Sequence, residues 1–374
     1  MRRVNLAVLA VFLAVEALLG SLLWLDYQAT ARQQLAGVQA DLHTGLRSVL
    51  SSYGQLVEVG LHGITGDGDD FAERVAAAGA AGERERDRLR GEIYRALHPH
   101  YVVLREHGVP GLDVVLADGH TLLRLARPDL YGDVAAAPGA VAAQALREGR
   151  PANAFEHSRV DPGFRYAFPL RHDGRVVGAL VFTVSYETVR AVRNQARGET
   201  PVATRFLLRR EPLAAASHPS VMGRYRVSAL HRDYVVEQGS RGLGDEPGAP
   251  LPAWVGALEA RLEQRPDIRA AMAEGRASTL HVCASGEGCH AVELLPIRDG
   301  AGRPAAYVAA YVPAPGLLAL RHHQLLLFAA MSLALALALV ALGRWLRSRE
   351  RLEAIGTHMG EGLYVMDRGG ASPT

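Results

Sequence analysis

The two cysteines of the chain, Cys283 and Cys289, are the residues whose type and spacing most directly suggest chemistry. The glycine-rich spacer between them, residues 284–288, can fold back, so in an oxidising compartment the pair favours a disulfide across a hairpin. Flanking His281 and His290 leave a metal site open, and free thiols are a third alternative. In a strand, His281 and Cys283 would share a face whereas Cys289 and His290 would point oppositely, which counts against the metal.

The remaining composition excludes several kinds of chemistry. All 41 basic residues are arginine, so the chain has neither a lysine-containing phosphate-binding loop nor a Schiff-base lysine. A formal charge of +2 predicts no nucleic-acid partner. His98, His100 and His107 lie close together, yet a His-Pro-His segment at a helix end favours a polar turn over a metal site. We expect no cofactor and no bound metal.

Two apolar stretches lie near the two ends of the sequence. Residues 4–25 and 325–346 each have about the 20 residues that an α-helix needs to cross a bilayer. Arginines precede the first stretch and follow the second, and short basic flanks stay in the cytoplasm. The sequence therefore predicts a bacterial inner-membrane protein with two spans, both termini in the cytoplasm and residues 26–324 in the periplasm.

The first apolar stretch has an alternative interpretation as a cleaved signal peptide. The small residues at 29–31 resemble a cleavage site, but the apolar run exceeds the roughly 7–15 residues of a signal core. We therefore favour a retained span. Glu16 lies within it, where a carboxyl group is costly. It either faces a helix–helix interface in a homodimer or is tolerated in a leucine-rich span.

Between the spans, apolar periodicity predicts a mixture of helices and strands. Apolar residues recur every three or four positions over 35–64, which is helical spacing. A glycine- and aspartate-rich break is expected at 65–82. Strand pairs are expected around Asp-Gly turns at 118–119 and 173–174, and Ser185 is a candidate helix cap. Further expected helices cover 83–107, 138–149 and 252–274, and further strands cover 204–209, 280–284, 291–297 and 305–312.

One pattern occurs twice in the sequence. Residues 169–184 and 296–312 both have Pro, an apolar residue, Arg, a glycine-containing turn, Arg and a closing strand that leads into a helix. Two copies of one pattern predict two similar α+β lobes. The length of the segment between the spans also suits two lobes better than one.

Residues 92–133 (EIYRALHPHYVVLREHGVPGLDVVLADGHTLLRLARPDLYGD) closely resemble the first lobe of double Cache domains, in the branch found in two-component sensor kinases. Residues 164–185 resemble the closing strands of that lobe, and RFLLRR and YRVSALHRDYVVE resemble parts of the second lobe. The resemblance implies an α+β fold in which two transmembrane helices flank a tandem PAS-like (double Cache) domain on a long N-terminal helix.

Domain boundaries follow from the spans and this resemblance. The expected order is a cytoplasmic N-terminus (1–3), transmembrane helix 1 (4–25), a long helical stalk (26–100), a membrane-distal Cache lobe (101–198), a membrane-proximal Cache lobe (199–313), a helix that includes transmembrane helix 2 (314–346) and a cytoplasmic signalling segment (347–374).

Residues 352–370 resemble the opening of a PAS domain, in which a helix and an E-G turn precede the first strand. In such receptors a PAS domain often leads to a histidine kinase or diguanylate cyclase, and the signatures of both are absent here. We therefore expect a truncated gene product, a sensory fragment that is not itself an enzyme. An intact enzyme would need those missing residues.

The resemblance also implies where a ligand binds, since the membrane-distal lobe is usually the binding lobe in this family. Arginine suits a carboxylate or other anion because its guanidinium offers two parallel donors, and an aspartate could hold an amino group. The alternative is that these residues are solvated or form structural clamps. The candidate ligand-binding residues are Arg124, Arg127, Tyr131, Asp133, Glu156, Arg165 and Tyr166.

Together these features predict a signal-transduction receptor that binds a small ligand in the periplasm and passes a helix displacement to a cytoplasmic output. We expect it to act as a homodimer in the lipid bilayer. The alternative is a membrane-tethered periplasmic protein-interaction module without a small-molecule ligand, which would expose a large apolar patch instead.

Overall fold

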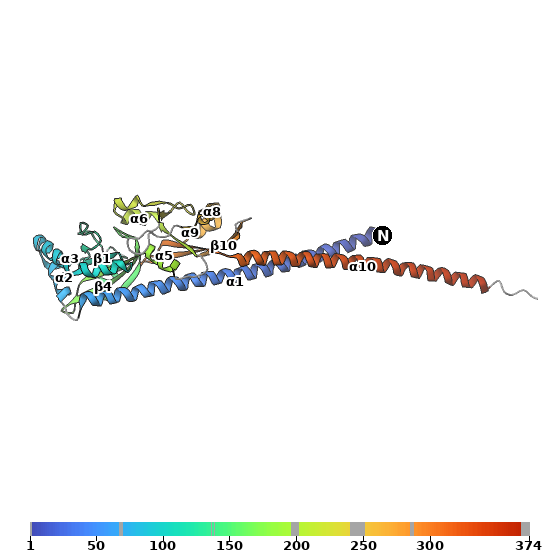
Figure 1. Cartoon of the computed structure of the whole chain (residues 1–374), viewed down its shortest axis with the longest axis horizontal. Coiled ribbons are helices and arrows are strands. Elements are labelled where there is room, and N and C mark those ends of the chain that lie inside the picture. The colour runs from blue at the N-terminus through green and yellow to red at the C-terminus, as the bar shows by residue number, and fades with distance from the viewer. Residues whose placement is uncertain are drawn as a thin grey trace, which may run out of the picture. The chain divides into compact units, whose positions relative to one another are not determined.

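The computed structural model describes residues 2–66, 70–135, 137, 139–195, 202–239, 251–284 and 288–367. The chain divides into two compact units. One consists of Met1–Gln34 and Pro315–Thr374, and the other is Leu35–Ala314. Helix α1 (Arg2–Thr65) belongs to both units, and β11 (Pro304–Pro313) ends directly before α10 (Pro315–Asp367) (Figure 1).

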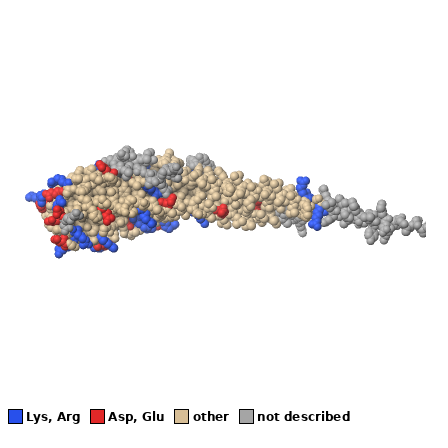
Figure 2. Space-filling view, turned by 60° about the horizontal axis from the view of Figure 1, so that its bottom comes forward, with Lys and Arg blue, Asp and Glu red and all other residues tan. Residues whose placement is uncertain are grey.

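The first unit contains two helices that are long and apolar enough to cross a membrane. The apolar stretches lie in Ala10–Thr65 and Pro315–Arg349, with mean hydropathies of 1.6 and 2.7. The face in Figure 2 carries few charged side chains over these parts of α1 and α10. An exposed apolar helix surface of this kind is stable next to hydrocarbon rather than water.

The two apolar helices contact each other through paired positions. The Ser332 hydroxyl donates to Glu16 Oε2 at 2.6 Å, and the Gln324 amide donates to Asp26 Oδ2 at 2.6 Å. As residue numbers rise along α1 they fall along α10, so the helices are antiparallel. The carboxyl of Glu16 therefore has a partner inside the apolar surface, as the interface interpretation requires, but the interface lies within one chain.

Helix α10 is continuous to Asp367. The PAS-like strand that the resemblance implies before Asp367 is therefore not formed: these residues are helical. A single strand has no neighbour to satisfy its backbone groups, whereas a helix satisfies its own. Residues 368–370, which the resemblance also includes, lie outside the described residues.

The first lobe of the second unit is a five-stranded antiparallel sheet with helices on both faces (Figure 1). Its strand order is β2-β1-β5-β4-β3. Its elements are α2 (Asp70–Ala80), α3 (Glu83–Glu106), β1 (Gly111–Leu116), β2 (Thr121–Arg124), α4 (Val141–Glu148), β3 (Ala152–Glu156), β4 (Gly163–His172), β5 (Arg175–Ser185) and α5 (Tyr186–Gln195).

The second lobe is a six-stranded antiparallel sheet with the order β7-β8-β6-β11-β10-β9. Its elements, apart from β11, are β6 (Ala203–Arg209), α6 (Arg210–Ala216), α7 (Pro219–Met222), β7 (Tyr225–Val227), β8 (Tyr234–Glu237), α8 (Ala253–Leu262), α9 (Pro266–Ala273), β9 (Ser278–Ala284) and β10 (Gly288–Arg298).

The two lobes repeat one topology. Without the edge strand β7, the second sheet has the order β8-β6-β11-β10-β9. When the five strands of each lobe are counted in chain order, leaving out β7, the order across both sheets is second, first, fifth, fourth, third. The sequence repeat at 169–184 and 296–312 corresponds to β4–β5 and β10–β11, the last hairpin of each lobe. The prediction of two similar lobes is confirmed.

Helices cover the two faces of the first sheet in different ways. One face packs against α1, α2 and α3 through a large core that includes Leu42, Val75 and Ile93. The other face packs against α4 through small residues, including Ala145 and Val181. Ser185 Oγ accepts the Thr188 N–H at 3.0 Å, so it caps α5 as predicted.

Two expected elements differ from the structure. The predicted break at 65–82 contains α2, because Phe71, Val75 and Ala78 give a buried stripe despite the glycine and aspartate around it. The predicted helix over 252–274 is two helices, since Pro266 at the start of α9 cannot continue a preceding helix. Residues 26–100, expected as one stalk, thus consist of part of α1, then α2 and most of α3.

Cys283 and Cys289 lie directly opposite each other in the β9–β10 register and form a disulfide. The predicted hairpin disulfide is confirmed, and neither cysteine is available as a free thiol or metal ligand. The His290 ring stacks on Trp254, with 4.5 Å between the ring centroids. The spacer residues 285–287 lie outside the described part of the chain.

Candidate functional site

A cluster of charged side chains lies on the α4 face of the first sheet. Strand alternation places Asp113, Arg165 and Thr183 on this face, because Val115, Ala167 and Val181, two residues away in each strand, pack against α4. Glu156 on β3 and Arg124 on β2 also belong to the cluster, because they lie within 4 Å of Arg165 and Asp113, respectively. Five neighbouring strands thus bring residues from 113 to 183 together, and we call this cluster the charged network.

Arg165 is the centre of the charged network. Its Nη2 donates to Asp113 Oδ2 at 2.6 Å, and its Nη1 lies 3.5 Å from Glu156 Oε2. The residue is only 7% exposed. Its Nε has no hydrogen-bond partner among the described residues. A buried guanidinium with one N–H unused still has capacity for an added acceptor.

Arg124 makes a bidentate pair with Asp133, and its Nε lies 3.9 Å from Asp113 Oδ2. The two guanidinium–carboxylate distances are 2.6 and 2.8 Å. Arg124 also donates to the Leu130 carbonyl at 2.8 Å and to Thr121 Oγ1 at 3.1 Å. These bonds fix the loop that follows β2 over the sheet. Arg124 therefore acts as a structural clamp, which was the alternative to a ligand-binding role for this residue.

For both Asp113 and Asp133, burial raises the pKa of the carboxyl group and the neighbouring arginine charges lower it. Burial raises the pKa of Asp113, against the lowering effect of the Arg165 and Arg124 charges. Burial also raises the pKa of Asp133, but its hydrogen bond to Arg124 and the charge of Arg124 outweigh this, so the pKa of Asp133 is lowered. The less buried Asp133 is thus firmly ionised, while Asp113 is the acid whose charge is least favoured.

The network fills most of the space beneath the loop. A hollow of only about 20 Å³ remains next to Asp113 and Arg124. A water-sized group would occupy it, whereas a larger ligand has to displace a partner of Arg124 or Arg165. Its lining residues are Pro110, Gly111, Asp113, Arg124, Ala126, Ser158, Val160, Asp161 and Thr183.

Four of the seven predicted site residues belong to the network: Arg124, Asp133, Glu156 and Arg165. Glu156 has a second role, because its Oε1 accepts the backbone N–H of Val141 at the start of α4. A carboxylate at that position suits the exposed donors of a helix N-terminus.

The other three predicted residues lie elsewhere. Tyr166 is on the opposite face of the sheet, where its hydroxyl donates to the Leu50 carbonyl of α1 at 2.8 Å. Arg127 is exposed and pairs with Asp129. Tyr131 is 48% exposed, with the Arg90 guanidinium over its ring at 3.6 Å. These three residues do not contact the charged network.

Asp113 is the network residue that the sequence analysis missed. It is the one charged residue in the otherwise apolar strand Gly111–Leu116. A charge within a buried strand requires a partner of opposite sign, and this signal was present in the sequence. Its partner could not be named, since Arg165 follows 52 residues later.

No protein-family model and no curated protein match the sequence. Solved structures similar to the chain include the sensor domain of the V. cholerae histidine kinase DctB, at 12% identity and a TM-score of 0.41, covering 76% of this chain and 98% of that one. A sensory box/GGDEF family domain from Vibrio parahaemolyticus has 14% identity and a TM-score of 0.36, covering 78% and 98%.

The sensory domain of the Campylobacter jejuni chemoreceptor Tlp3, with isoleucine bound, is similar at 10% identity and a TM-score of 0.37, covering 78% of this chain and 97% of that one. These structures are sensor domains of a histidine kinase, a GGDEF protein and a chemoreceptor.

Proposed function

We propose that the chain is a transmembrane signal receptor whose two apolar helices cross a bacterial inner membrane. The arginine flanks place both termini in the cytoplasm and Leu35–Ala314 in the periplasm. The Cys283–Cys289 disulfide supports this orientation, because such bonds persist in oxidising compartments. An alkaline phosphatase fusion after residue 250 should be active and one after residue 360 inactive. The reverse pattern would contradict the orientation.

The ligand is a small molecule that bears a carboxylate, and it binds at the charged network. The observation that carries this assignment is the buried Arg165, whose Nε is unused. A ligand carboxylate can accept from Nε and replace the 3.5 Å contact to Glu156. The acids Asp113, Glu156 and Asp133 can then hold an amino group, so a molecule with both charges fits best.

Signal transfer uses the continuity between the sheet and α10. The second-lobe strand β11 ends at Pro313, and α10 begins at Pro315. A shift of β11 is therefore passed to the second span, and in a homodimer it changes the packing of the spans. The output that receives this shift is of the histidine kinase or diguanylate cyclase type, and residues 1–374 serve as its sensory part rather than as an enzyme.

A thermal-shift screen of the full chain in lipid nanodiscs tests the ligand assignment. Amino acids and dicarboxylates are the first probes, because a ligand that binds the folded state raises its melting temperature. Arg165→Gln should abolish the shift, whereas Arg127→Gln, a change at an exposed ion pair outside the network, should leave it intact. A shift that survives Arg165→Gln places the ligand elsewhere, and no shift with any probe favours the protein-interaction module.

A further inference from the structure

A second cavity in Leu35–Ala314 lies mostly outside the charged network. It has a volume of about 750 Å³ and lies between α1, the β3–β4 edge of the first sheet and β10 of the second lobe. This volume is within the range of about 300–1,000 Å³ for small-molecule sites. Strand alternation turns most of the cavity away from the network, because Phe155, Phe164 and Tyr166 point to the α1 face of the sheet. Arg165 is also among the lining residues, so the cavity meets the network at this one residue.

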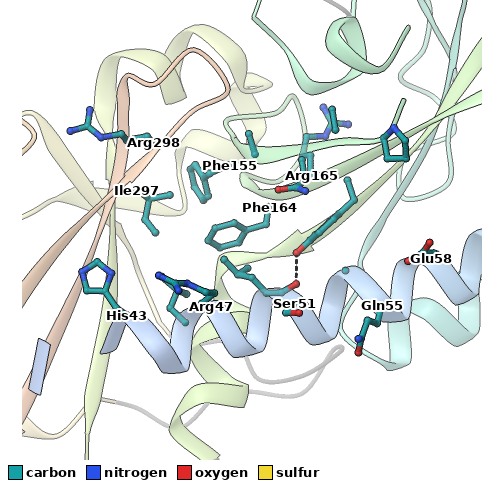
Figure 3. A pocket seen from close by; sticks show the side chains of 18 of the residues that line it. His43, Arg47, Ser51, Gln55, Glu58, Phe155, Phe164, Arg165, Ile297 and Arg298 are labelled. Carbon is teal, nitrogen blue, oxygen red and sulfur yellow. Dashed lines mark hydrogen bonds between the residues drawn. The ribbon is translucent and has the colours of Figure 1, made fainter. Parts of the chain in front are cut away.

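The floor of the cavity is apolar and largely aromatic. Figure 3 shows Phe155, Phe164 and Ile297 facing the row of side chains that α1 contributes. Phe155 is 1% exposed and Phe164 is 7% exposed, so both are fixed by packing. The apolar lining consists of Leu46, Leu50, Pro151, Ala152, Ala154, Phe155, Phe164, Phe168, Leu295, Pro296 and Ile297.

The rim carries charge of opposite sign at its two ends. His43 and Arg47 lie one helical turn apart on α1, and Arg298 lies at the same end of the cavity (Figure 3). Glu58 is at the other end, about 22 Å along the helix from His43 at 1.5 Å per residue. Arg298 donates to the carbonyls of Gly302 and Gly275, at 2.9 and 3.1 Å.

Arg47 is the cation with donors to spare. It is exposed, and within the described residues it makes no hydrogen bond or ion pair. The geometry points to a second ligand site here, which takes a monoanion with an apolar body, such as an arylalkyl carboxylate. The body lies on Phe155 and Phe164 and the carboxylate meets Arg47. The carboxylate position at Arg47 is not part of the charged network, which the cavity meets only at Arg165, so failure of this site would leave the proposed function intact.

The two sites share strand β4. Tyr166 lines the cavity and ties the strand to α1 through the Leu50 carbonyl, while its neighbour Arg165 reaches into the charged network on the other face. A ligand in the cavity that moves Tyr166 therefore moves the backbone that carries Arg165. A ligand in one site then changes the affinity of the other site for its own ligand. The change is the same in both directions, because the coupling free energy is shared.

Binding of 4-phenylbutyrate to the full chain in lipid nanodiscs tests this inference by calorimetry, with empty nanodiscs subtracted. We expect saturable binding of 4-phenylbutyrate and none of 4-phenylbutylamine, which has the same body and the opposite charge. Arg47→Gln should weaken binding by about tenfold or more, as the loss of a charge-assisted hydrogen bond predicts. Arg32→Gln, on the same helix and outside the cavity lining, is its control.

Gly54 offers a steric test with a matched control. A Cβ at Gly54 would lie 3.5 Å from Tyr166 Cε1 inside the cavity, whereas one at Gly37 on the same helix meets nothing within 4 Å. Both Gly54→Leu and Gly37→Leu favour the helix, so neither should fail to fold. Gly54→Leu should abolish binding of 4-phenylbutyrate, and Gly37→Leu should leave it unchanged.

Four results would overturn the inference. Equal binding of the amine would remove the role of charge, and unchanged binding in Gly54→Leu would move the ligand out of the cavity. Loss of dimers in Gly54→Leu without any binding of 4-phenylbutyrate would show that a second copy of the chain covers the cavity. Binding lost in Arg165→Gln but kept in Gly54→Leu would place the probe in the charged network instead.

Discussion

The Arg165 guanidinium and the Asp113 carboxylate form a buried ion pair at 2.6 Å although 52 residues separate them in the sequence. Their strands, β4 and β1, are not neighbours, because β5 lies between them in the sheet. The pair therefore bridges over the central strand. Each member is less than 10% exposed, so the loss of one would leave the other buried with a more distant partner, Arg124 at 3.9 Å from Asp113 or Glu156 at 3.5 Å from Arg165.

Arg165→Met should destabilise the lobe by at most about 3–5 kcal/mol, because it removes the closest partner of the buried Asp113 and leaves only Arg124, at 3.9 Å. The double variant Asp113→Leu/Arg165→Met should recover most of this loss, since it removes both charges. Urea unfolding of the full chain in lipid nanodiscs measures both changes. Arg127→Met, which breaks an exposed pair with Asp129, should leave the stability almost unchanged. An equally small effect of Arg165→Met would show that the network contributes little to stability.

The sequence predicted the network in part, for reasons that particular residues make plain. Arg124 and Arg165 lie in strands, and strand alternation sets their face once the sheet order is known. Arg127 and Tyr131 lie in the loop after β2, where no periodicity fixes the direction of a side chain. Asp113 was missed because its partner comes from a strand that is distant in the sequence.

The fold was more predictable than the site. Hairpins around Asp-Gly turns and the cysteine hairpin are local, and local signals predicted them. Helix α2 was missed because its buried stripe of Phe71, Val75 and Ala78 is short and alanine-rich. The 750 Å³ cavity could not be predicted, since residues from α1, β4 and β10 meet there only through the tertiary fold.

His157 connects the two lobes and should make their packing sensitive to pH. Its Nε2 lies 2.9 Å from the Ala305 carbonyl of β11. Burial lowers the pKa of His157 from 6.5 to about 4, although the Ala305 carbonyl and Asp299 favour the charged ring. The folded state thus binds the proton less well than the unfolded state. Its stability should fall as the pH drops from about 6.5 to about 4, by at most about 3 kcal/mol.

Melting temperatures of His157→Gln in nanodiscs across this pH range check the effect. Glutamine keeps a donor for the Ala305 carbonyl but cannot gain a charge, so the variant should lose much of the pH dependence. His120→Gln, which changes a histidine whose side chain is 46% exposed, should behave like the wild type. An unchanged slope in His157→Gln would assign the pH dependence to other groups.

Glu293 is a buried carboxyl in the second lobe, and its removal should stabilise the protein. It is fully buried, and its Oε2 accepts a hydrogen bond from the Thr279 hydroxyl. Its Oε1 has no partner in the described residues. Burial raises the pKa of Glu293 above 4.5, against the lowering effect of Thr279. The folded state therefore binds the proton more tightly, and stability falls as the pH rises through the raised pKa.

Glu293→Gln should accordingly melt at a higher temperature than the wild type at pH 8, and the difference should shrink as the pH approaches 4.5. The amide keeps the shape of the side chain and removes the charge. Glu263→Gln, at an exposed position after α8, should show no such trend. A lower melting temperature for Glu293→Gln at pH 8 would mean that its charge has a stabilising partner.

The antiparallel contact of α1 and α10 gives a register that crosslinking can measure. A Cβ at Gly20 would lie 3.5 Å from Phe328, so Gly20→Cys/Phe328→Cys should react with a short bis-maleimide in nanodiscs. Gly20→Cys/Leu335→Cys places the second thiol two turns further along α10, about 10.5 Å away, and should react poorly. The native cysteines do not interfere, because they are joined to each other.

The cysteine pair at positions 20 and 328 also tests the proposed transfer of a signal from β11 to α10. Because β11 leads directly into α10, a ligand that shifts the sheet should move α10 along its axis against α1. The interhelical bonds of Glu16 with Ser332 and of Asp26 with Gln324 hold the resting register. Ligand should therefore lower the yield of the 20–328 crosslink, and Glu16→Ala should lower it without ligand. A yield that neither change affects would show that the two helices stay fixed while the receptor signals, and relay would then have to occur between the chains of a dimer.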